Sequence, residues 1–274
     1  MTPLYERLPV CVFPEHPRHF HAYCVGTPRS GTVSICDQFR NFRSAHEPES
    51  RFLTQKIIAY RTGQLSYDGM MKYIRHRDRR MQLEMDSSYL NSEIIEFLVP
   101  ASPESKFVLT LRDCLSWADS FTNFLINKPE FLNRKRHIRE HMALEFGTPP
   151  FHYSPYEKIL EESGLHPIRQ YLTYWTDHNQ RVLENVPADR LLVIRTTEIG
   201  ESAAPLEKFL SLPPGSLISS VHSNPARARH SILEKIDPVF LHETMLECCG
   251  ELMARFFPDK LNEPAAKASL NSQA

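Results

Sequence analysis

This sequence has no long hydrophobic runs, and its net charge is close to zero. The apolar run near the N-terminus, Val10–Phe13, is too short for a signal peptide, and no stretch is long enough to span a membrane. We therefore expect a cytoplasmic protein. The formal net charge at pH 7 is -1, which excludes a protein that binds nucleic acid or anionic membranes by bulk charge. Any anion site must be local.

Cysteine pairs with the spacing of metal ligands are also missing. None of the six cysteines belongs to a CxxC pair, and several lie in apolar segments, which favours reduced thiols in the core. His16, His19 and His21 cluster near the N-terminus, but their spacing matches no common metal-binding motif. We expect no metal site.

Glycine is scarce, because the chain of 274 residues has only nine, yet Gly26 and Gly31 lie in one stretch, Tyr23–Ile35. An apolar run, Ala22–Val25, precedes the two glycines, and apolar residues at helical spacing follow them, so the pattern predicts strand, tight loop and helix. In such a junction, loop amides and the positive end of the helix dipole converge on one point. The stretch is a candidate anion site.

The spacing of the two glycines matches the front of a nucleotide-binding P-loop, but its second half differs. Thr32-Val33 replaces the usual Lys-Ser/Thr pair, and the loop cation is Arg29 instead. The hydroxyl that would hold magnesium beside a triphosphate is missing at its usual position, which argues against an ATPase or kinase. A kinase-like P-loop phosphotransferase and a non-catalytic nucleotide-binding module remain the alternatives.

A second motif follows the clearest strand of the chain. Phe107–Leu111 is short and rich in residues that favour strands, and it runs directly into Arg112. The helix expected over 115–127 carries Ser120, eight positions after Arg112. This spacing brings a guanidinium and a hydroxyl close enough to hold one more anion.

Strands and helices alternate along the rest of the chain, which predicts an α/β fold with a three-layer, P-loop-type parallel sheet between helices. We expect one domain over 1–274, with helical insertions at 51–80 and 128–165 forming a lid and a disordered tail at 260–274. The basic runs 75–80 and 134–139 are typical of solvated helix faces. Further strands are expected at 81–85 and 190–194, and further helices at 51–62, 66–80, 92–98, 130–146, 168–186, 204–210 and 238–257.

These residues carry a resemblance to a known family. Thr27–Thr32 resembles the 5′-phosphosulfate-binding loop of P-loop sulfotransferases of the soluble, bacterial type, and Leu111–Ser120 resembles their 3′-phosphate motif. The segment 191–213 is similar to the fourth-strand region of the family. The resemblance implies transfer of a sulfuryl group from the co-substrate 3′-phosphoadenosine-5′-phosphosulfate (PAPS) to a hydroxyl of a small-molecule, lipid or carbohydrate acceptor. It implies no metal requirement, because a sulfuryl group carries less negative charge than a phosphoryl group.

The resemblance also implies roles for individual residues. Arg29 would neutralise the charge that develops on the leaving nucleotide, and Arg112 with Ser120 would hold the 3′-phosphate. Arg227 and Arg229 lie where family members bring a second basic clamp to that phosphate. The 5′-phosphosulfate would bind the loop formed by Pro28, Arg29, Ser30, Gly31, Thr32 and Val33.

The acceptor must lose a proton, so a general base is expected near the sulfur atom. Our choice is Glu47, which follows Arg29 by 18 residues. Pro48 disfavours continuation of a helix, which puts His46, Glu47 and Glu49 on a loop. Some carbohydrate and tyrosine sulfotransferases place a catalytic glutamate near this position. Asp86 and His46 are the alternative bases, and Glu49 is a weaker one.

Overall fold

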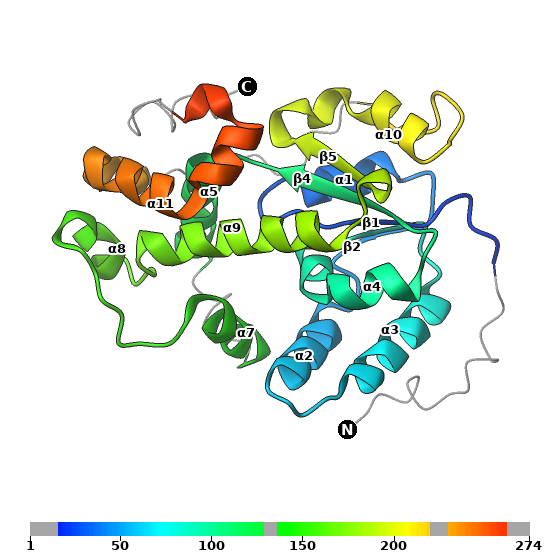
Figure 1. Ribbon diagram of the computed structural model, residues 1–274, viewed down its shortest axis with the longest axis horizontal. Helices are drawn as coiled ribbons and strands as arrows, with labels where there is room; N and C mark the ends of the chain where they lie inside the picture. Colours follow the sequence, from blue (N-terminus) through cyan, green and yellow to red (C-terminus); the bar gives the residue numbers. More distant parts are fainter. Residues whose placement is uncertain (1–15, 129–135, 220–229, 262–274) are drawn as a thin grey trace. The chain divides into compact units, whose positions relative to one another are not determined.

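The computed structural model describes residues 16–128, 136–219 and 230–261, which form two compact units (Figure 1). The sheet unit comprises residues 1–26, 31–110 and 181–223, and the helical unit comprises 27–30, 111–180 and 224–274. Each is described here by itself. The expectation of one domain over 1–274 stays a prediction.

The sheet unit is built on a five-stranded parallel sheet in the order β2-β3-β1-β4-β5. Its central strand β1 pairs with β3 and β4, with Tyr23 opposite Asp86 on one side and Phe107 on the other. The chain therefore changes direction across the sheet at β1, and ligands of open parallel sheets bind at such points, beyond the carboxyl ends of the strands. The strands are β1 (Ala22–Cys24), β2 (Ser44–His46), β3 (Met85–Ser87), β4 (Lys106–Leu111) and β5 (Leu191–Arg195).

Helices cover both faces of this sheet, since α2, α3 and α4 lie on one side and α1 and α10 on the other (Figure 1). Successive side chains of β1 alternate between these faces. Tyr23 and Val25 join a core with residues of α2, α3 and α4, while Ala22 and Cys24 join a core with residues of α1 and α10. The helices are α1 (Thr32–Gln38), α2 (Ser50–Arg61), α3 (Tyr67–Met81), η3 (Tyr89–Ile94), α4 (Ile95–Ala101), η5 (Ala188–Arg190), η6 (Thr196–Glu201) and α10 (Ala203–Phe209).

The helical unit packs around buried aromatic side chains. Trp117 and Phe121 of α5 stack with ring centroids 5.2 Å apart, and Phe121 meets Tyr171 of α9 edge to face at 5.9 Å. The boundary with the sheet unit falls within α9, between Gln180 and Arg181. The elements are α5 (Cys114–Asn127), α7 (Arg136–Phe146), η4 (Pro155–Glu157), α8 (Lys158–Glu162), α9 (Ile168–Asn185), η7 (Leu233–Lys235), α11 (Pro238–Phe256) and η8 (Pro258–Lys260).

Three expectations about local structure are corrected. The segment with His46 was expected to be a loop, but Ser44–His46 is the edge strand β2, so Glu47 is the first residue after a strand. The strand expected over 81–85 lies later, at Met85–Ser87, because α3 continues through Met81. The basic run 75–80 is not simply a solvated face, since Arg77 is only 4% exposed.

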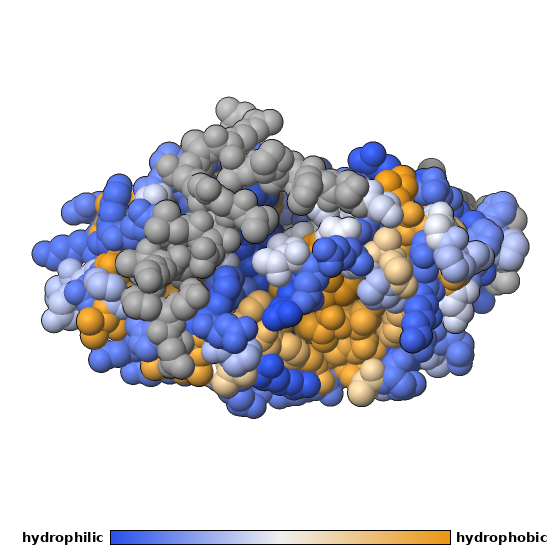
Figure 2. Space-filling view, turned by 90° about the horizontal axis from the view of Figure 1, so that it is seen from above, coloured by the Kyte–Doolittle hydropathy of each residue, from blue (hydrophilic) through white to orange (hydrophobic). Residues whose placement is uncertain are grey.

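Hydrophilic side chains dominate much of the surface, but hydrophobic ones form a continuous area on the face that Figure 2 shows. Among the described residues, the exposed large apolar side chains are Tyr67 on α3, Tyr156 on η4, and Val239 and Leu246 on α11. Single exposed apolar residues are normal for globular proteins. Among the described helices, none combines the length and apolar character needed to cross a bilayer.

Candidate active site

The loop between β1 and α1 adopts an unusual backbone. Arg29 has φ 67° and Gly31 has φ 95°, both in the left-handed region that L side chains rarely occupy. A Cβ atom at Gly31 would lie 2.2 Å from Cδ1 of Ile199. Glycine is therefore required at 31, and strain at a residue such as Arg29 is typical of functional sites.

The first half of this loop is fastened to α5 within the helical unit. The indole N–H of Trp117 donates to the carbonyl oxygen of Pro28 at 2.7 Å, and the hydroxyl of Ser30 donates to that of Thr27 at 2.7 Å. Buried hydrogen bonds of this kind hold a loop in one conformation. The loop is therefore preorganised around Arg29.

Arg29 brings the two sequence motifs together. Its Nε atom lies 3.5 Å from Oγ of Ser120, and its guanidinium carbon lies 5.7 Å from the ring centre of Phe124. The side chain is half-buried, and desolvation lowers its pKa. Among the described residues, no carboxylate forms an ion pair with it. A partly desolvated cation with neutral neighbours is stabilised when an anion binds beside it.

Arg112 lies just before α5, the helix that carries Ser120. Its Nε–H donates to Oγ of Ser116 at 3.2 Å, and its carbonyl oxygen accepts from the indole N–H of Trp175 at 2.9 Å. Arg112 and Ser120 are half-buried, whereas residues 113–119 between them are buried. Both predicted 3′-phosphate residues thus keep part of their surface exposed. The expected second clamp, Arg227 and Arg229, lies outside the described residues.

The second half of the loop begins α1 in the sheet unit. Oγ1 of Thr32 lies 3.1 Å from Nε2 of His46, and the hydroxyl of Ser87 donates to the carbonyl oxygen of Thr32 at 2.7 Å. The ends of β2 and β3 therefore meet the N-terminus of α1, where free backbone amides favour an anion. Val33 follows in the first turn of this helix.

Glu47 directly follows β2 and is therefore next to His46, which contacts Thr32. Its N–H donates to the carbonyl oxygen of Ser87 at 2.8 Å, and its φ of 49° is again in the left-handed region. Burial raises the pKa of the Glu47 carboxyl, and the neighbouring charge of His46 partly opposes that rise. A carboxylate with a raised pKa is a better proton acceptor than an ordinary glutamate.

The other two acidic candidates are engaged in ion pairs. Asp86 is 3% exposed, and its Oδ2 lies 2.6 Å from Nη1 of Arg77. Glu49 pairs with Arg80 at 2.5 Å. Arg77 also donates to the carbonyl oxygen of Pro48 at 3.1 Å, so α3 fixes the loop that carries Glu47.

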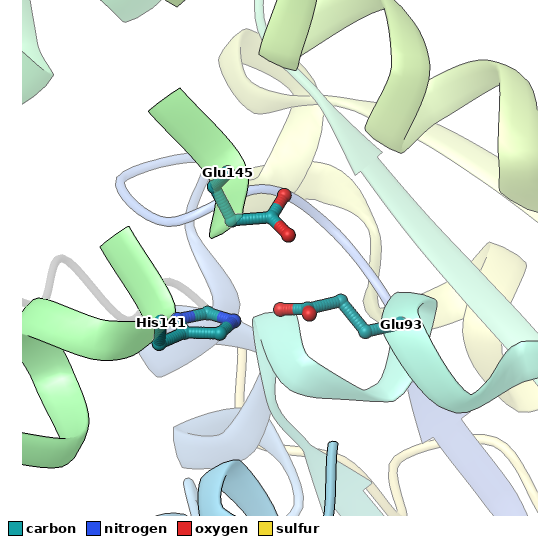
Figure 3. Close-up of side chains that lie close together, drawn as sticks. All are labelled: Glu93, His141 and Glu145. Carbon is teal, nitrogen blue, oxygen red and sulfur yellow. The ribbon is translucent and has the colours of Figure 1, made fainter. Parts of the chain in front are cut away.

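Carboxylate and imidazole side chains of the kind that bind metals occur in both units (Figure 3). Glu93 comes from η3 of the sheet unit, whereas His141 and Glu145 come from α7 of the helical unit. His141 and Glu145 are four residues apart and lie on one face of α7. Two ligands are fewer than a protein metal site normally uses, so we assign no metal to α7.

Sequence reasoning missed several residues that support the site. Trp117 and Trp175 fall in helices expected over 115–127 and 168–186 and were given no role there, but each indole N–H donates to a backbone carbonyl of a predicted motif. A buried tryptophan usually needs such a partner, and that requirement was the available signal. Ser116 and Arg77 gave no signal in the sequence, because their partners are set by the folded geometry.

Comparison with known proteins identifies the family. The model of the sulfotransferase domain family matches residues 23–226, which is well over half of the chain. The chain therefore belongs to this family and is a sulfotransferase, an enzyme with an α/β fold.

Individual relatives are more distant. The protein "Ava biosynthesis cluster protein M" of Aspergillus versicolor is 26% identical over 205 residues, which cover 69% of this chain and 75% of that protein. A sulfotransferase structure from Alicyclobacillus acidocaldarius is 17% identical and covers 91% of this chain and 94% of its own, with a TM-score of 0.44. The sulfotransferase domain of the Synechococcus PCC 7002 olefin synthase is 15% identical and covers 84% of this chain and 85% of its own, with a TM-score of 0.39.

Proposed function

We propose that this sulfotransferase uses PAPS as its donor and transfers the sulfuryl group in line to a hydroxyl of a small-molecule, lipid or carbohydrate acceptor. The observation that carries the proposal is the 3.5 Å approach of Arg29 to Ser120, which joins the two sequence motifs within one unit. Arg29 is a half-buried cation without a carboxylate partner among the described residues. A nucleotide with phosphate groups at both its 5′ and 3′ positions supplies the missing negative charge for both motifs.

Different residues are proposed to bind the 5′ and the 3′ ends of the nucleotide. The loop Pro28–Val33 binds the 5′-phosphosulfate through backbone amides, while Arg29 neutralises the bridging oxygen as the S–O bond to the phosphate breaks. Arg112 and Ser120 bind the 3′-phosphate, which distinguishes the donor from ATP. Their partial exposure supports this division, as does their place around the start of α5, with Arg112 just before the helix and Ser120 in its second turn.

Glu47 is the proposed general base. As the acceptor oxygen forms its bond to sulfur, the hydroxyl proton passes to the Glu47 carboxylate, and the electron pair of the broken S–O bond stays on the leaving adenosine 3′,5′-bisphosphate. Two observations favour Glu47 over Asp86 and Glu49: burial raises its pKa, and the other two carboxylates are held by Arg77 and Arg80. His46 remains an alternative base, since it contacts Thr32 at the N-terminus of α1.

A small-molecule hydroxyl is the acceptor class that we favour. The name of the Aspergillus versicolor relative assigns that protein to a biosynthesis cluster, and such clusters make small molecules. No metal ion is needed for the proposed chemistry, because a guanidinium and loop amides stabilise the departing charge.

The donor assignment is tested with purified protein and two measurements. Calorimetry should show binding of adenosine 3′,5′-bisphosphate without magnesium, and little binding of ATP with magnesium. Sulfur-labelled PAPS with a panel of hydroxylated small molecules should then give labelled product. Magnesium-dependent ATP binding would favour a phosphotransferase instead, and donor binding without turnover across the panel would favour a binding module.

A further inference from the structure

The C-terminal turn η8 places a lysine beside the proposed 3′-phosphate motif. Nζ of Lys260 lies 3.0 Å from Oδ2 of Asp113, the residue that follows Arg112. The Asp113 side chain is 7% exposed and that of Lys260 is 27% exposed. The sequence assigned residues 260–274 to a disordered tail, but Lys260 belongs to an ordered turn.

One hydrogen bond closes this turn, and one contact holds its end against α11 in the helical unit. The N–H of Lys260 donates to the carbonyl oxygen of Phe257 at 3.0 Å, and a ring nitrogen of His242 lies 3.1 Å from the carbonyl oxygen of Leu261. The side chain of Phe257 is buried. The ammonium group is therefore attached to a fixed part of the backbone.

A chain of hydrogen bonds connects Lys260 to Arg112. The Nε–H of Arg112 donates to Oγ of Ser116, and the Ser116 hydroxyl donates to the Asp113 carboxylate, which also receives Lys260. Asp113 caps α5 as well, since its Oδ1 accepts the backbone N–H of Ser116 at 3.0 Å. Ser116 and Asp113 thus connect the Arg112 side chain to Lys260.

Asp113 poses an electrostatic problem for an anion site. A carboxylate one residue from Arg112 repels a phosphate and also competes with it for the guanidinium. Lys260 removes both effects by pairing with that carboxylate. With Lys260 present, Arg112, Asp113 and Lys260 carry a net positive charge, and without it their charges cancel.

We propose that Lys260 is a positioning residue of the donor site, which neutralises Asp113 and so reduces the competition of this carboxylate with the 3′-phosphate for Arg112. This inference rests on the proposed use of PAPS. It predicts that Lys260 acts on the 3′-phosphate alone and that its effect disappears when Asp113 carries no charge.

The test measures dissociation constants of the full chain for adenosine 3′,5′-bisphosphate and adenosine 5′-monophosphate. Lys260→Met should weaken bisphosphate binding by about twofold to 160-fold, which corresponds to the coupling energies of about 0.5–3 kcal/mol between residues in one network, and leave monophosphate binding unchanged. Lys260→Arg should preserve binding. Lys235→Met, which removes an exposed lysine elsewhere in the helical unit, is the control and should change neither constant.

The double variant Asp113→Asn/Lys260→Met separates positioning from direct contact. Asparagine caps helices about as well as aspartate, so α5 is retained, and bisphosphate affinity should return to near the wild-type value. A double variant as weak as Lys260→Met would show that Lys260 binds the phosphate itself, which would overturn the positioning role.

Two further outcomes separate this inference from the proposed function. Wild-type protein that does not prefer the bisphosphate to the monophosphate would overturn both. A wild-type preference that Lys260→Met leaves intact, or an equal loss for both nucleotides, would overturn the role of Lys260 alone.

Discussion

Arg29 and Arg77 are both withdrawn from solvent, but they have opposite surroundings. Arg77, on α3 of the sheet unit, is 4% exposed and meets the Asp86 carboxylate at 2.6 Å. Arg29, on the loop before α1, has Ser120 and the ring of Phe124 as neighbours, and no described carboxylate neutralises it. The charge of Arg77 is satisfied within the fold, whereas the charge of Arg29 is suited to an external anion. The difference separates a structural arginine from a ligand-binding one.

The largest expected effect comes from replacing Arg29. Arg29→Met should reduce sulfuryl transfer by about a thousandfold or more, since arginines that neutralise a leaving group contribute on this scale. Thermal stability should not fall, because the variant removes a partly desolvated cation that lacks an ionic partner. Steady-state kinetics and thermal denaturation measure the two effects.

Arg29→Lys is the control for that experiment, because it keeps the charge and loses the planar guanidinium. Its activity should lie between those of Arg29→Met and the wild type. Full activity in Arg29→Met would show that Arg29 has no role in sulfuryl transfer. The distinction between Arg29 as a ligand-binding arginine and Arg77 as a structural one would then be wrong.

Replacing Arg77 should lower stability, whereas replacing Arg29 should lower activity. Arg77→Met leaves Asp86 buried without its partner and should lower the free energy of unfolding by about 3–5 kcal/mol, the usual cost of breaking a buried pair. Urea denaturation followed by circular dichroism measures this loss. Asp86→Asn should show a loss in the same direction.

Asp86→Asn also tests the rival base. If that variant remains folded and binds the donor but loses transfer, then Asp86 acts in catalysis and the ion pair with Arg77 is not its main role. Retained transfer per folded molecule would leave Glu47 as the leading carboxylate.

The sequence predicted the parts of the fold that have strong local patterns. The apolar runs gave β1, β4 and β5 nearly at their bounds. Strand β2 was missed because Ser44–His46 is a short edge strand with half-buried or exposed residues and no apolar alternation. Strand β3 was placed too early because Met81, at the end of α3, continued the alternating pattern of Leu83 and Met85.

For the candidate site, the sequence predicted spacing within a motif better than contacts between motifs. Gly31 and Arg112 were predicted because strand–loop–helix junctions place such residues at fixed positions. The approach of Arg29 to Ser120, 91 residues apart, and the pairing of Arg77 with Asp86 depend on tertiary packing. Short-range patterns carry no information about these distances.

Glu47→Gln should reduce kcat by about a hundredfold or more, the usual contribution of a general base. Binding of adenosine 3′,5′-bisphosphate should stay unchanged, because the proposed role of Glu47 concerns the acceptor proton. Glu49→Gln is the matched control, since Glu49 lies on the same loop and pairs with Arg80. It should have the smaller effect on kcat. Unchanged kcat in Glu47→Gln, with loss in His46→Gln, would assign the base to His46.

The smallest predicted effect is a displacement of the pH profile. Because burial raises the pKa of Glu47 above its ordinary value of 4.5, and the base must be ionised, kcat/KM should rise with pH along a limb above that value. His46→Gln removes the charge that lowers the Glu47 pKa, so the limb should move to higher pH, provided that His46 is not itself the base.

Stability gives an independent readout of the same pKa shift. The folded protein holds the Glu47 proton more tightly than the unfolded chain does. This proton therefore contributes to the free energy of unfolding at low pH, and the contribution is lost as pH rises through the pKa of Glu47 in the folded protein. Glu47→Gln should therefore gain stability relative to wild type as pH rises through this range, by urea denaturation at each pH. If the difference in stability between Glu47→Gln and wild type does not change with pH, Glu47 is an ordinary solvated carboxylate. Burial would then no longer support Glu47 as the general base.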